Sequence, residues 1–228
     1  NHSTDKTPDF LQSFKGKAQI ITNAVNVGFS KACNQGARIA TGQYLLFLNN
    51  DTEPHQEWLE EMVTVADSNA KIGIVGSKLL FPDGTIQHAG VCMPAIHLHR
   101  GQPSNLIAAN KSRDFQIVTG ACMLVRKDLF FKLRGFDEKF INGCEDIDLC
   151  LKARKAGARV FYTSRSVLTH HEGKSEGRED KMDLNRKRLI KRWKDQQLVP
   201  DFEHYMEQDG FRRQGTEWVY NQHLCRPT

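Results

Sequence analysis

Hydrophobic residues in the first half of the chain follow two alternating spacings. Segments 28–40 and 57–67 have apolar residues at helical spacing, whereas 44–48 and 72–81 are continuous apolar runs next to turn residues. A continuous run such as 44–48 is typical of a strand that is buried on both faces, as in a parallel sheet. The alternation of strands and helices therefore predicts an α/β fold with a mostly parallel, mixed central sheet flanked by helices.

The rest of the chain predicts shorter elements. Residues from 173 onward are strongly polar and then helical, which predicts a main domain over 1–178 and a C-terminal helical appendage over 179–228. We expect further helices at 7–14, 127–134, 146–156 and 184–194, and further strands at 18–22, 85–93, 116–126 and 158–163.

One long connection separates the predicted strands 85–93 and 116–126. Segment 94–114 is polar and irregular, and it carries His97, His99 and Arg100. Loops of about 20 residues are usually functional or disordered. We therefore expect either a surface loop or a lid over a binding site.

Composition places the chain among folded globular proteins and limits its partners. Hydrophobic residues make up 39% and charged residues 26% of the chain, which is typical of globular domains. The net charge is +5, and positive residues concentrate only in 186–194, so we expect no nucleic-acid partner. We expect that segment to form a solvated helix with Leu189, Ile190 and Trp193 packing inward. The alternative is a peripheral contact with an anionic membrane surface.

The cysteines indicate a compartment rather than a site. None forms a C-x-x-C pair, which excludes the usual patterns of a zinc ribbon and of a thioredoxin site. Several lie in apolar runs, where a free cysteine behaves as a small buried hydrophobe. We therefore expect a reducing, cytoplasmic location, with the inner face of the membrane as the alternative. The six residues are Cys33, Cys92, Cys122, Cys144, Cys150 and Cys225.

A first polar cluster, Asn49 to Glu53, comes directly after the apolar run 44–48. Ligands of open α/β sheets bind beyond the carboxyl ends of the strands. Asp51, next to two side-chain amides, is suited to hold a divalent cation together with substrate phosphates. The alternative is a turn that caps a helix, because Asn, Asp and Thr favour both.

A second cluster opens the predicted helix 146–156 with three carboxylates, Glu145, Asp146 and Asp148. Negative charge at a helix N-terminus is stabilised by the helix dipole, so a purely structural role is one interpretation. The apolar residues that follow predict a largely buried helix. Carboxylates crowded near a core acquire raised pKa values, as a catalytic base requires.

A third cluster, His170 and His171, follows the predicted strand 158–163 and a short connection. Adjacent histidines can ligate a metal ion. The alternative is a pair of loop histidines that face solvent.

Taken in order, these clusters resemble the family-2 glycosyltransferases with the GT-A fold. The resemblance runs from residue 1 to about 193. Segment 49–52 stands where that family has its D-x-D metal motif, and 119–126 is similar to its T-G-A strand on the acceptor side. The other similar segments are 1–7 (V-D-N-x-S-x-D-x-T), 26–42 (N-x-G-F…N-x-G…A-x-G), 135–151 (G-F-D-E…E-D-x-D-L-C-L) and 168–175 (v-x-H-H-E-x-x-S).

The resemblance implies inverting transfer of a sugar from a nucleotide-sugar donor to a glycan or a lipid-linked saccharide. Asp51 would bind Mg²⁺ or Mn²⁺ beside the donor diphosphate, and His170 would complete that site. Asp146 would accept the proton of the acceptor hydroxyl, with Glu145 and Asp148 as rival bases. The resemblance also assigns substrate binding to Asn26, Gly28, Asn34, Asn49, Thr119, Gly120 and Ala121.

Two departures from the family pattern matter. Asn49 replaces the first carboxylate of the D-x-D motif, which predicts a weaker metal site. The family's first strand, its base-binding residues and the Asp of its second strand have no counterpart here. We expect them to precede Asn1, so upstream residues of the same protein are an expected partner. We also expect this segment alone to bind UDP or TDP poorly in calorimetry.

The alternative function is a non-catalytic GT-A domain that serves as a scaffold or binding module of a longer protein. A nucleotidyltransferase is disfavoured because the chain has no Gly-rich phosphate loop with Lys or Arg. The enzyme hypothesis depends on one spatial condition. Asp51, Asp146 and His170, which are far apart in sequence, must lie in the same cleft.

Overall fold

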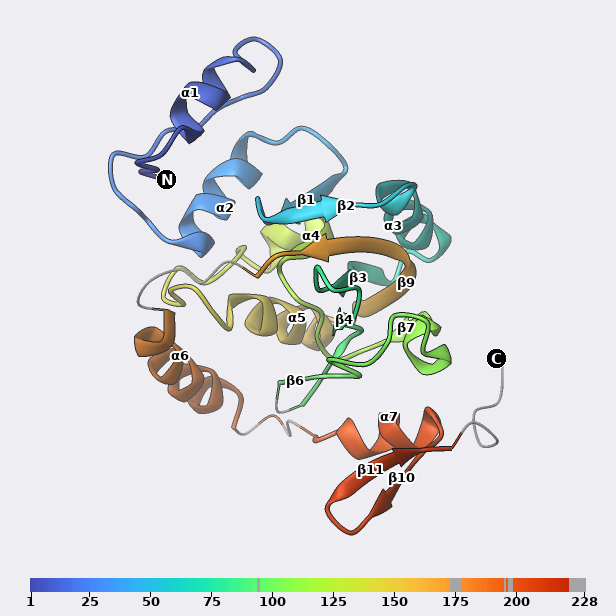
Figure 1. Cartoon of the computed structure of the whole chain (residues 1–228). Coiled ribbons are helices and arrows are strands. Elements are labelled where there is room, and N and C mark those ends of the chain that lie inside the picture. The colour runs from blue at the N-terminus through green and yellow to red at the C-terminus, as the bar shows by residue number, and fades with distance from the viewer. Residues whose placement is uncertain (94, 173–177, 195, 197–198, 222–228) are drawn as a thin grey trace.

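The computed structural model describes residues 1–93, 95–172, 178–194, 196 and 199–221, and its central feature is a seven-stranded sheet with helices on both faces (Figure 1). Two short strands join the sides of this sheet, β4 (Ile86–His88) on β3 and β7 (Arg113–Asp114) on β9. The main strands lie in the order β1 (Tyr44–Leu48), β8 (Cys122–Arg126), β3 (Ile72–Leu80), β9 (Arg159–His170) and β2 (Thr52–Pro54).

The predicted mixed α/β sheet is confirmed, but its strands are not mostly parallel. Among the described strands of this sheet, β3 and β9 run parallel and every other pair is antiparallel. The connections explain the difference. Strand β9 returns through a crossover that contains helix α5 (Glu145–Lys155), which permits a parallel pair. Strand β4 follows β3 through the short turn at Asp83 and Gly84, which requires an antiparallel pair.

Burial differs between the two apolar runs. Every residue of β3 is buried, because β8 and β9 flank it on both sides. In β1 only Leu45 and Phe47 are buried, and Leu48 is 42% exposed. The prediction that 44–48 is buried on both faces is therefore wrong, since β1 is the last strand of the described sheet on that side.

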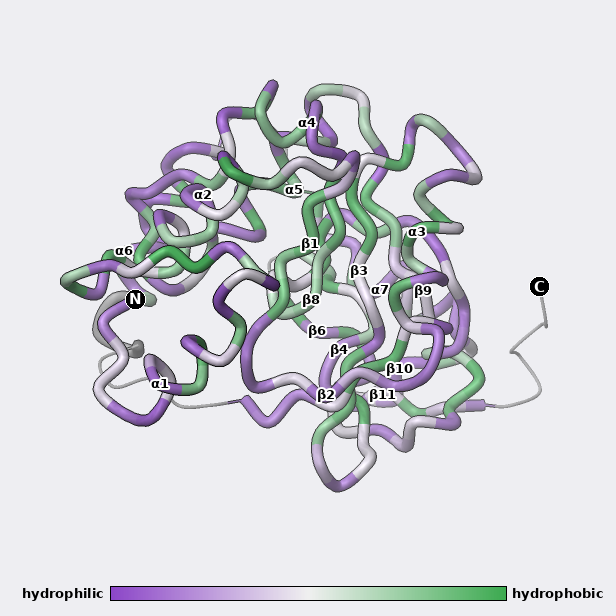
Figure 2. Tube along the Cα trace, turned by 90° about the horizontal axis from the view of Figure 1, so that it is seen from above, coloured by the Kyte–Doolittle hydropathy of each residue, from purple (hydrophilic) through white to green (hydrophobic). Residues whose placement is uncertain are grey.

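The helices cover the sheet in two groups. Met62 and Ala66 of α3 (Trp58–Ser68) pack on one face of β3 and β8. Helices α2 (Phe29–Ile39), α4 (Lys127–Lys132) and α5 contribute to the larger core on the other face. Figure 2 shows apolar residues concentrated on β1, β3 and β8 in the middle of the molecule. None of the described helices has the length and apolar character of a membrane span.

Two predicted segments differ from the structure. The strand expected at 18–22 is absent, and Ile21 is 39% exposed. This apolar stretch pairs with no strand beyond a single bridge from Ala18 to Lys15 within the described residues. Helix α1 (Thr7–Gln12), by contrast, forms where residues 7–14 predicted one.

Segment 94–114 is not a free loop. It contains strand β6 (Ile96–His97), which pairs with β5 (Val91–Cys92), and a short 3₁₀ helix, η1 (Ile107–Asn110). Leu98 is completely buried. His99 is also buried, and its Nε2 lies 2.7 Å from the carboxylate of Asp209. The segment is therefore anchored to the main core and to the C-terminal part of the chain.

The C-terminal part is more than helical. After α6 (Arg178–Trp193) and α7 (Phe202–Gln208), strands β10 (Phe211–Gln214) and β11 (Glu217–Tyr220) form an antiparallel hairpin. Met206 and Phe211 belong to the main core, which ties this part to the sheet. The predicted helical appendage thus contains a hairpin as well as helices, and the domain division at 178/179 stays a prediction. Cys225 and residues 173–175 of the closing motif lie outside the described residues.

Candidate active site

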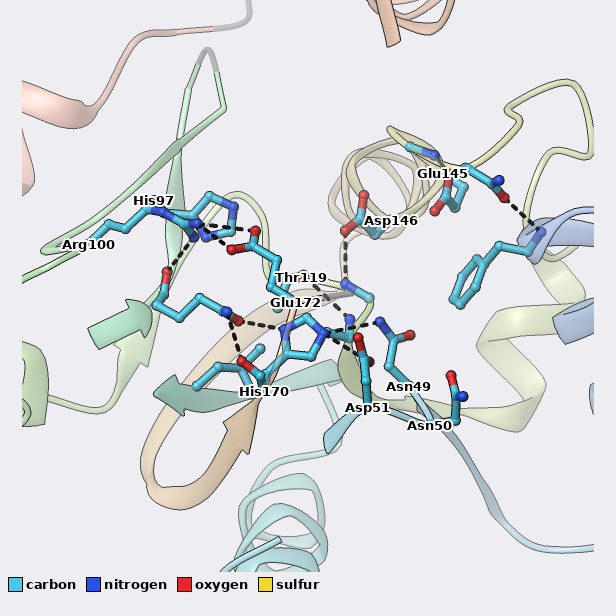
Figure 3. Close-up of a pocket in the computed structure, with 17 residues that line it drawn as sticks. Asn49, Asn50, Asp51, His97, Arg100, Thr119, Glu145, Asp146, His170 and Glu172 are labelled. Carbon is cyan, nitrogen blue, oxygen red and sulfur yellow. Dashed lines mark hydrogen bonds and ion pairs between the residues drawn. The ribbon is translucent and has the colours of Figure 1, made fainter. Parts of the chain in front are cut away.

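A cavity of about 290 Å³ lies where β1 and β9 end and where α5 begins (Figure 3). It is mostly polar, and segments from eight different parts of the sequence meet in it. Its lining consists of Phe29, Asn49, Asn50, Asp51, Leu79, Gln87, His97, Arg100, Thr119, Gly120, Ala121, Asn142, Gly143, Glu145, Asp146, His170 and Glu172.

The cavity satisfies the spatial condition set by the sequence, because Asp51, Asp146 and His170 all line it. The backbone N–H of Asn49 donates to the carbonyl of Ala121, which continues the pairing of β1 with β8 past the end of the strand. The chain then turns, and β2 pairs with the last residues of β9, opposite to it in direction. This pairing places Asp51 next to His170, which are 119 positions apart.

His170 is held in one orientation by Gln87. The Nδ1 of His170 lies 2.5 Å from Oε1 of Gln87, and Nε2 of Gln87 donates to the carbonyl of His170 at 3.1 Å. Since the Gln87 oxygen can only accept, Nδ1 of His170 carries the hydrogen. The other ring nitrogen, Nε2, lies 3.1 Å from Oδ1 of Asp51. With its hydrogen on Nδ1, His170 places Nε2 beside the Asp51 carboxylate, so that both groups could ligate one cation.

This donor set fits a divalent cation in part. An imidazole Nε2 and a carboxylate oxygen converge, with the Asn49 amide 3.5 Å from the same Nε2. No group of three or more His, Cys, Asp or Glu side chains among the described residues is arranged to hold a metal. Mg²⁺ binds through one or two carboxylates plus substrate phosphates and water. The residues therefore suit a cation whose coordination a diphosphate completes.

Asp146 lies in the first turn of α5, across the cavity from Asp51 (Figure 3). Its Oδ2 accepts the backbone N–H of Gly120 at 2.8 Å, and its Oδ1 accepts that of Ile147 at 2.8 Å. A Cβ atom at position 120 would lie 3.2 Å from the Asp146 Cβ, so glycine permits this close approach. The segment before β8 thereby orients the Asp146 carboxylate.

The two rival carboxylates have different surroundings. Glu145 lines the cavity, and its Oε2 accepts the backbone N–H of Gly143 at 2.6 Å. Asp148 is fully buried away from the cavity lining. Its carboxylate accepts hydrogen bonds from Arg192 at 2.9 Å and from the Trp193 indole at 3.0 Å, with Lys152 3.2 Å away. Asp148 is thus corrected from a candidate base to a residue that fixes α6 on α5.

The predicted substrate-binding residues divide in the same way. Asn49, Thr119, Gly120 and Ala121 line the cavity, whereas Asn26, Gly28 and Asn34 do not. The Asn26 side chain accepts the backbone N–H of Gly28, which has φ +81° immediately before α2. The buried side chain of Asn34 exchanges hydrogen bonds with the backbone of Phe136. These three residues shape and anchor α2, and Phe29 at its start reaches the cavity instead.

Sequence reasoning grouped Gln87 with the long loop, as part of a hairpin or of a lid, and it connected neither of them with the metal motif. His97 and Arg100 of segment 94–114 line the wall that also contains Glu172. The Arg100 guanidinium donates to both oxygens of Glu172, at 2.8 and 3.1 Å, and stacks over the ring of Phe81. No local pattern marks the pair of Arg100 and Glu172, because the two residues are 72 positions apart.

His97 contributes a neutral imidazole to this wall. Burial and the nearby Arg100 charge lower the pKa of His97 to about 4. Its Nδ1 lies 3.2 Å from Nδ1 of His88, whose pKa is also lowered by burial. The Nε2 of His88 is buried with no hydrogen-bond partner in the described part of the chain. A buried N–H without an acceptor is less favourable than a buried lone pair without a donor. The Nδ1–H of His88 therefore donates to Nδ1 of His97, and His97 carries its own hydrogen on Nε2.

Comparison with known families matches residues 1–134 to a family model described as "Glycosyl transferase family 2". The chain is 40% identical over 152 residues to the O-antigen biosynthesis protein RfbC of Myxococcus xanthus. This match covers 62% of this chain and 12% of that protein. It is 24% identical over 205 residues to an N-acetylglucosaminyl-diphospho-decaprenol L-rhamnosyltransferase of Mycobacterium tuberculosis, covering 78% of this chain and 67% of the relative.

Two solved structures share the fold. One is GalNAc-T7 with UDP, GalNAc and Mn²⁺, with a TM-score of 0.61 at 17% identity over 82% of this chain and 39% of the other. The second is TarS 1–349 of S. aureus in complex with UDP-GlcNAc. It has a TM-score of 0.61 and 17% sequence identity, and the match covers 90% of this chain and 58% of the TarS chain. Both neighbours are GT-A glycosyltransferases, so the architecture described above is a GT-A fold.

Proposed function

Because this chain belongs to glycosyl transferase family 2, we propose that it moves a sugar from a nucleotide-sugar donor to a glycan or lipid-linked acceptor, with inversion and with Asp146 as the base. The membership itself makes the chain a glycosyltransferase domain. The observation that carries the proposal is the shared cavity, in which the carboxylate of Asp146 faces the Asp51–His170 pair. The cavity is lined by polar atoms from both sides, as a sugar between two reacting groups requires.

The proposed reaction is a single displacement. An acceptor hydroxyl oxygen attacks the anomeric carbon, and its proton passes to Asp146. The bond from the anomeric carbon to the diphosphate oxygen breaks, and its electron pair leaves with the nucleoside diphosphate. The two backbone N–H groups that bind the Asp146 carboxylate fix its orientation in the cavity.

Asp51 and His170 are the residues that would hold Mg²⁺ or Mn²⁺, with Gln87 fixing the His170 ring. When bound there, the cation would neutralise charge on the leaving diphosphate. The similar structures are complexes with UDP, GalNAc and Mn²⁺ and with UDP-GlcNAc, which supports a nucleotide-sugar donor and a cation for this chain. Arg100 and Glu172 complete the wall beside His170.

The acceptor and the location are further parts of the proposal. The name of one relative, N-acetylglucosaminyl-diphospho-decaprenol L-rhamnosyltransferase, includes a lipid-linked saccharide, which supports an acceptor of this kind for the present chain. The reaction would take place in the cytoplasm or at the inner face of the membrane. The five described cysteines are free thiols, in agreement with a reducing compartment.

A second candidate, a non-catalytic scaffold or binding module, is favoured by Asn49 in place of a metal-binding carboxylate. The chain also spans only 12% and 19% of two curated relatives, so the whole protein's activity is a proposal. Replacing Asp146 with Asn in the full-length protein separates the two. Loss of a general base should lower sugar transfer about 10²–10⁴-fold. A variant that transfers sugar at the rate of the parent would remove Asp146 from this role.

A further inference from the structure

The outer surface of helix α6 carries an unusual mixture of side chains. Leu184 and Ile190 are 56% and 60% exposed, although both are aliphatic. They lie among exposed basic residues, and Asp183 is the one acidic residue on this surface among the described side chains. We call this surface the basic face, and it consists of Leu184, Arg186, Lys187, Ile190, Lys191 and, just after the helix, Lys194.

The opposite surface of α6 holds the helix on the protein. Asn185, Leu189 and Trp193, which are four residues apart, are buried against α5 and the segment before it. Residue 190 is turned about 100° away from residue 189 along a helix. Ile190 therefore points outward, and the expectation that it packs inward with its neighbours is wrong.

The basic residues of α6 also divide between the two surfaces. Arg192 pairs with Asp137 and Asp148, and Arg188 donates to the carbonyl of Lys139. On the basic face, Arg186 has an exposed ion pair with Asp183 at 3.8 Å. Lys187, Lys191 and Lys194 have no ion pair with any described residue. Arg188 and Arg192 thus bind other parts of the protein, whereas the basic residues of the basic face are exposed to solvent.

The position of α6 relates the basic face to the cavity. The Asn185 side chain donates to the carbonyl of Ile141 at 3.0 Å, and Met182 lies against Gly143. Asn142 and Gly143 in turn line the cavity. The first half of α6 therefore supports one wall of the candidate active site from outside.

We propose that the basic face binds the surface of an anionic lipid bilayer. Lysines and arginines would contact the headgroups, while Leu184 and Ile190 enter the interface between headgroups and acyl chains. Charge complementarity selects this occupant, because each basic residue near an anionic surface strengthens binding about fivefold. Binding itself does not depend on the proposed sugar transfer. Its consequence, delivery of a lipid-linked acceptor to the adjacent cavity, does rest on that function.

The test is sedimentation of the full-length protein with vesicles rich in phosphatidylglycerol and with vesicles of phosphatidylcholine alone. We expect binding to the anionic vesicles only, weakened by salt. Lys187→Gln combined with Lys191→Gln should weaken that binding about 25-fold, and Leu184→Ser with Ile190→Ser should weaken it as well. Lys71→Gln with Lys155→Gln removes the same charge from exposed positions elsewhere and should leave binding unchanged. Circular dichroism checks that each variant is folded.

Three results would overturn the proposal: equal binding to neutral vesicles, equal losses in the control pair, or binding of single-stranded nucleic acid in preference to vesicles. Transfer assays keep this proposal separate from the proposed function. Asp146→Asn should bind vesicles normally, and the Lys187/Lys191 variant should glycosylate a water-soluble acceptor as well as the parent does. Vesicle binding without any sugar transfer would refute the proposed function alone.

Discussion

Asp148 and Asp146 are two residues apart, yet the structure predicts opposite consequences for the same substitution. The side chain of Asp148 is completely buried. It forms ion pairs with Arg192 and Lys152 and accepts a hydrogen bond from the Trp193 indole. That of Asp146 lines the cavity. We therefore expect Asp148→Asn to destabilise the protein without a direct effect on chemistry, and Asp146→Asn to lower transfer about 10²–10⁴-fold with little effect on stability.

The magnitude follows from the partners of Asp148. Asn at this position keeps one acceptor for the Trp193 indole but loses the charge that balances Arg192 and Lys152. Hydrogen bonds to charged groups contribute about 1.5–3 kcal/mol each. The Arg192 and Lys152 side chains are 33% and 23% exposed, so water solvates them in part after the substitution. We expect a loss of about 2–4 kcal/mol in the free energy of unfolding, or roughly 4–16 °C in Tm.

Urea unfolding followed by tryptophan fluorescence measures this loss, and sugar transfer below the unfolding transition measures activity. Asp183→Asn is a matched control on α6, the helix that Asp148 holds on α5, because the Asp183 side chain is 81% exposed in its ion pair. That control should change stability by less than about 0.5 kcal/mol. Asp148→Asn with unchanged stability and lost transfer would reverse the assignment and return Asp148 to the list of candidate bases.

Three more predictions follow from other contacts. Burial opposes ionisation of Asp209, but hydrogen bonds from His99 and Arg113 lower its pKa below the ordinary value. The Asp209 carboxylate therefore stabilises the fold at neutral pH and loses this effect as pH falls below about 4. The free energy of unfolding, measured at several pH values, should depend less on acid pH in Asp209→Asn than in the parent. An equal pH dependence in the two proteins would contradict this prediction. Gln87→Leu should weaken Mn²⁺ binding about 10–100-fold by releasing the His170 ring, and calorimetry with Gln56→Leu, an exposed position, as control tests this. Gly120→Ala should lower transfer by displacing Asp146, with a near-normal Tm; normal turnover would show that the carboxylate tolerates the added methyl group.

Much of the architecture was predictable because its signals are local. The apolar spacing in 57–67 and the run 72–81 identified α3 and β3 within a residue or two. The direction of β8 relative to its neighbours was not predictable, since a strand of the same composition fits either orientation. The absent strand at 18–22 has the same cause, because an apolar stretch becomes a strand only when another strand pairs with it.

The candidate site shows the same limit at the level of single residues. Its carboxylates and histidine were visible as polar clusters next to apolar segments, and the order of the clusters identified the family. Residue pattern alone could not rank Glu145, Asp146 and Asp148, because all three stand in one helical turn, and only the family resemblance favoured Asp146. The structure gives Asp146 and Asp148 different surroundings through Gly120 and Arg192, which approach that turn from distant parts of the chain.

The sequence by itself therefore determined the local elements, the family and the chemical types of residue available for a reaction. Only the tertiary structure decided which of them share a cavity. Gln87 orients His170 across 83 positions, and Asp51 meets the same histidine through the pairing of β2 with β9. Backbone propensity and hydrophobic spacing act over a few residues, whereas the position of a side chain in a site depends on packing between segments that the chain brings together only when it folds.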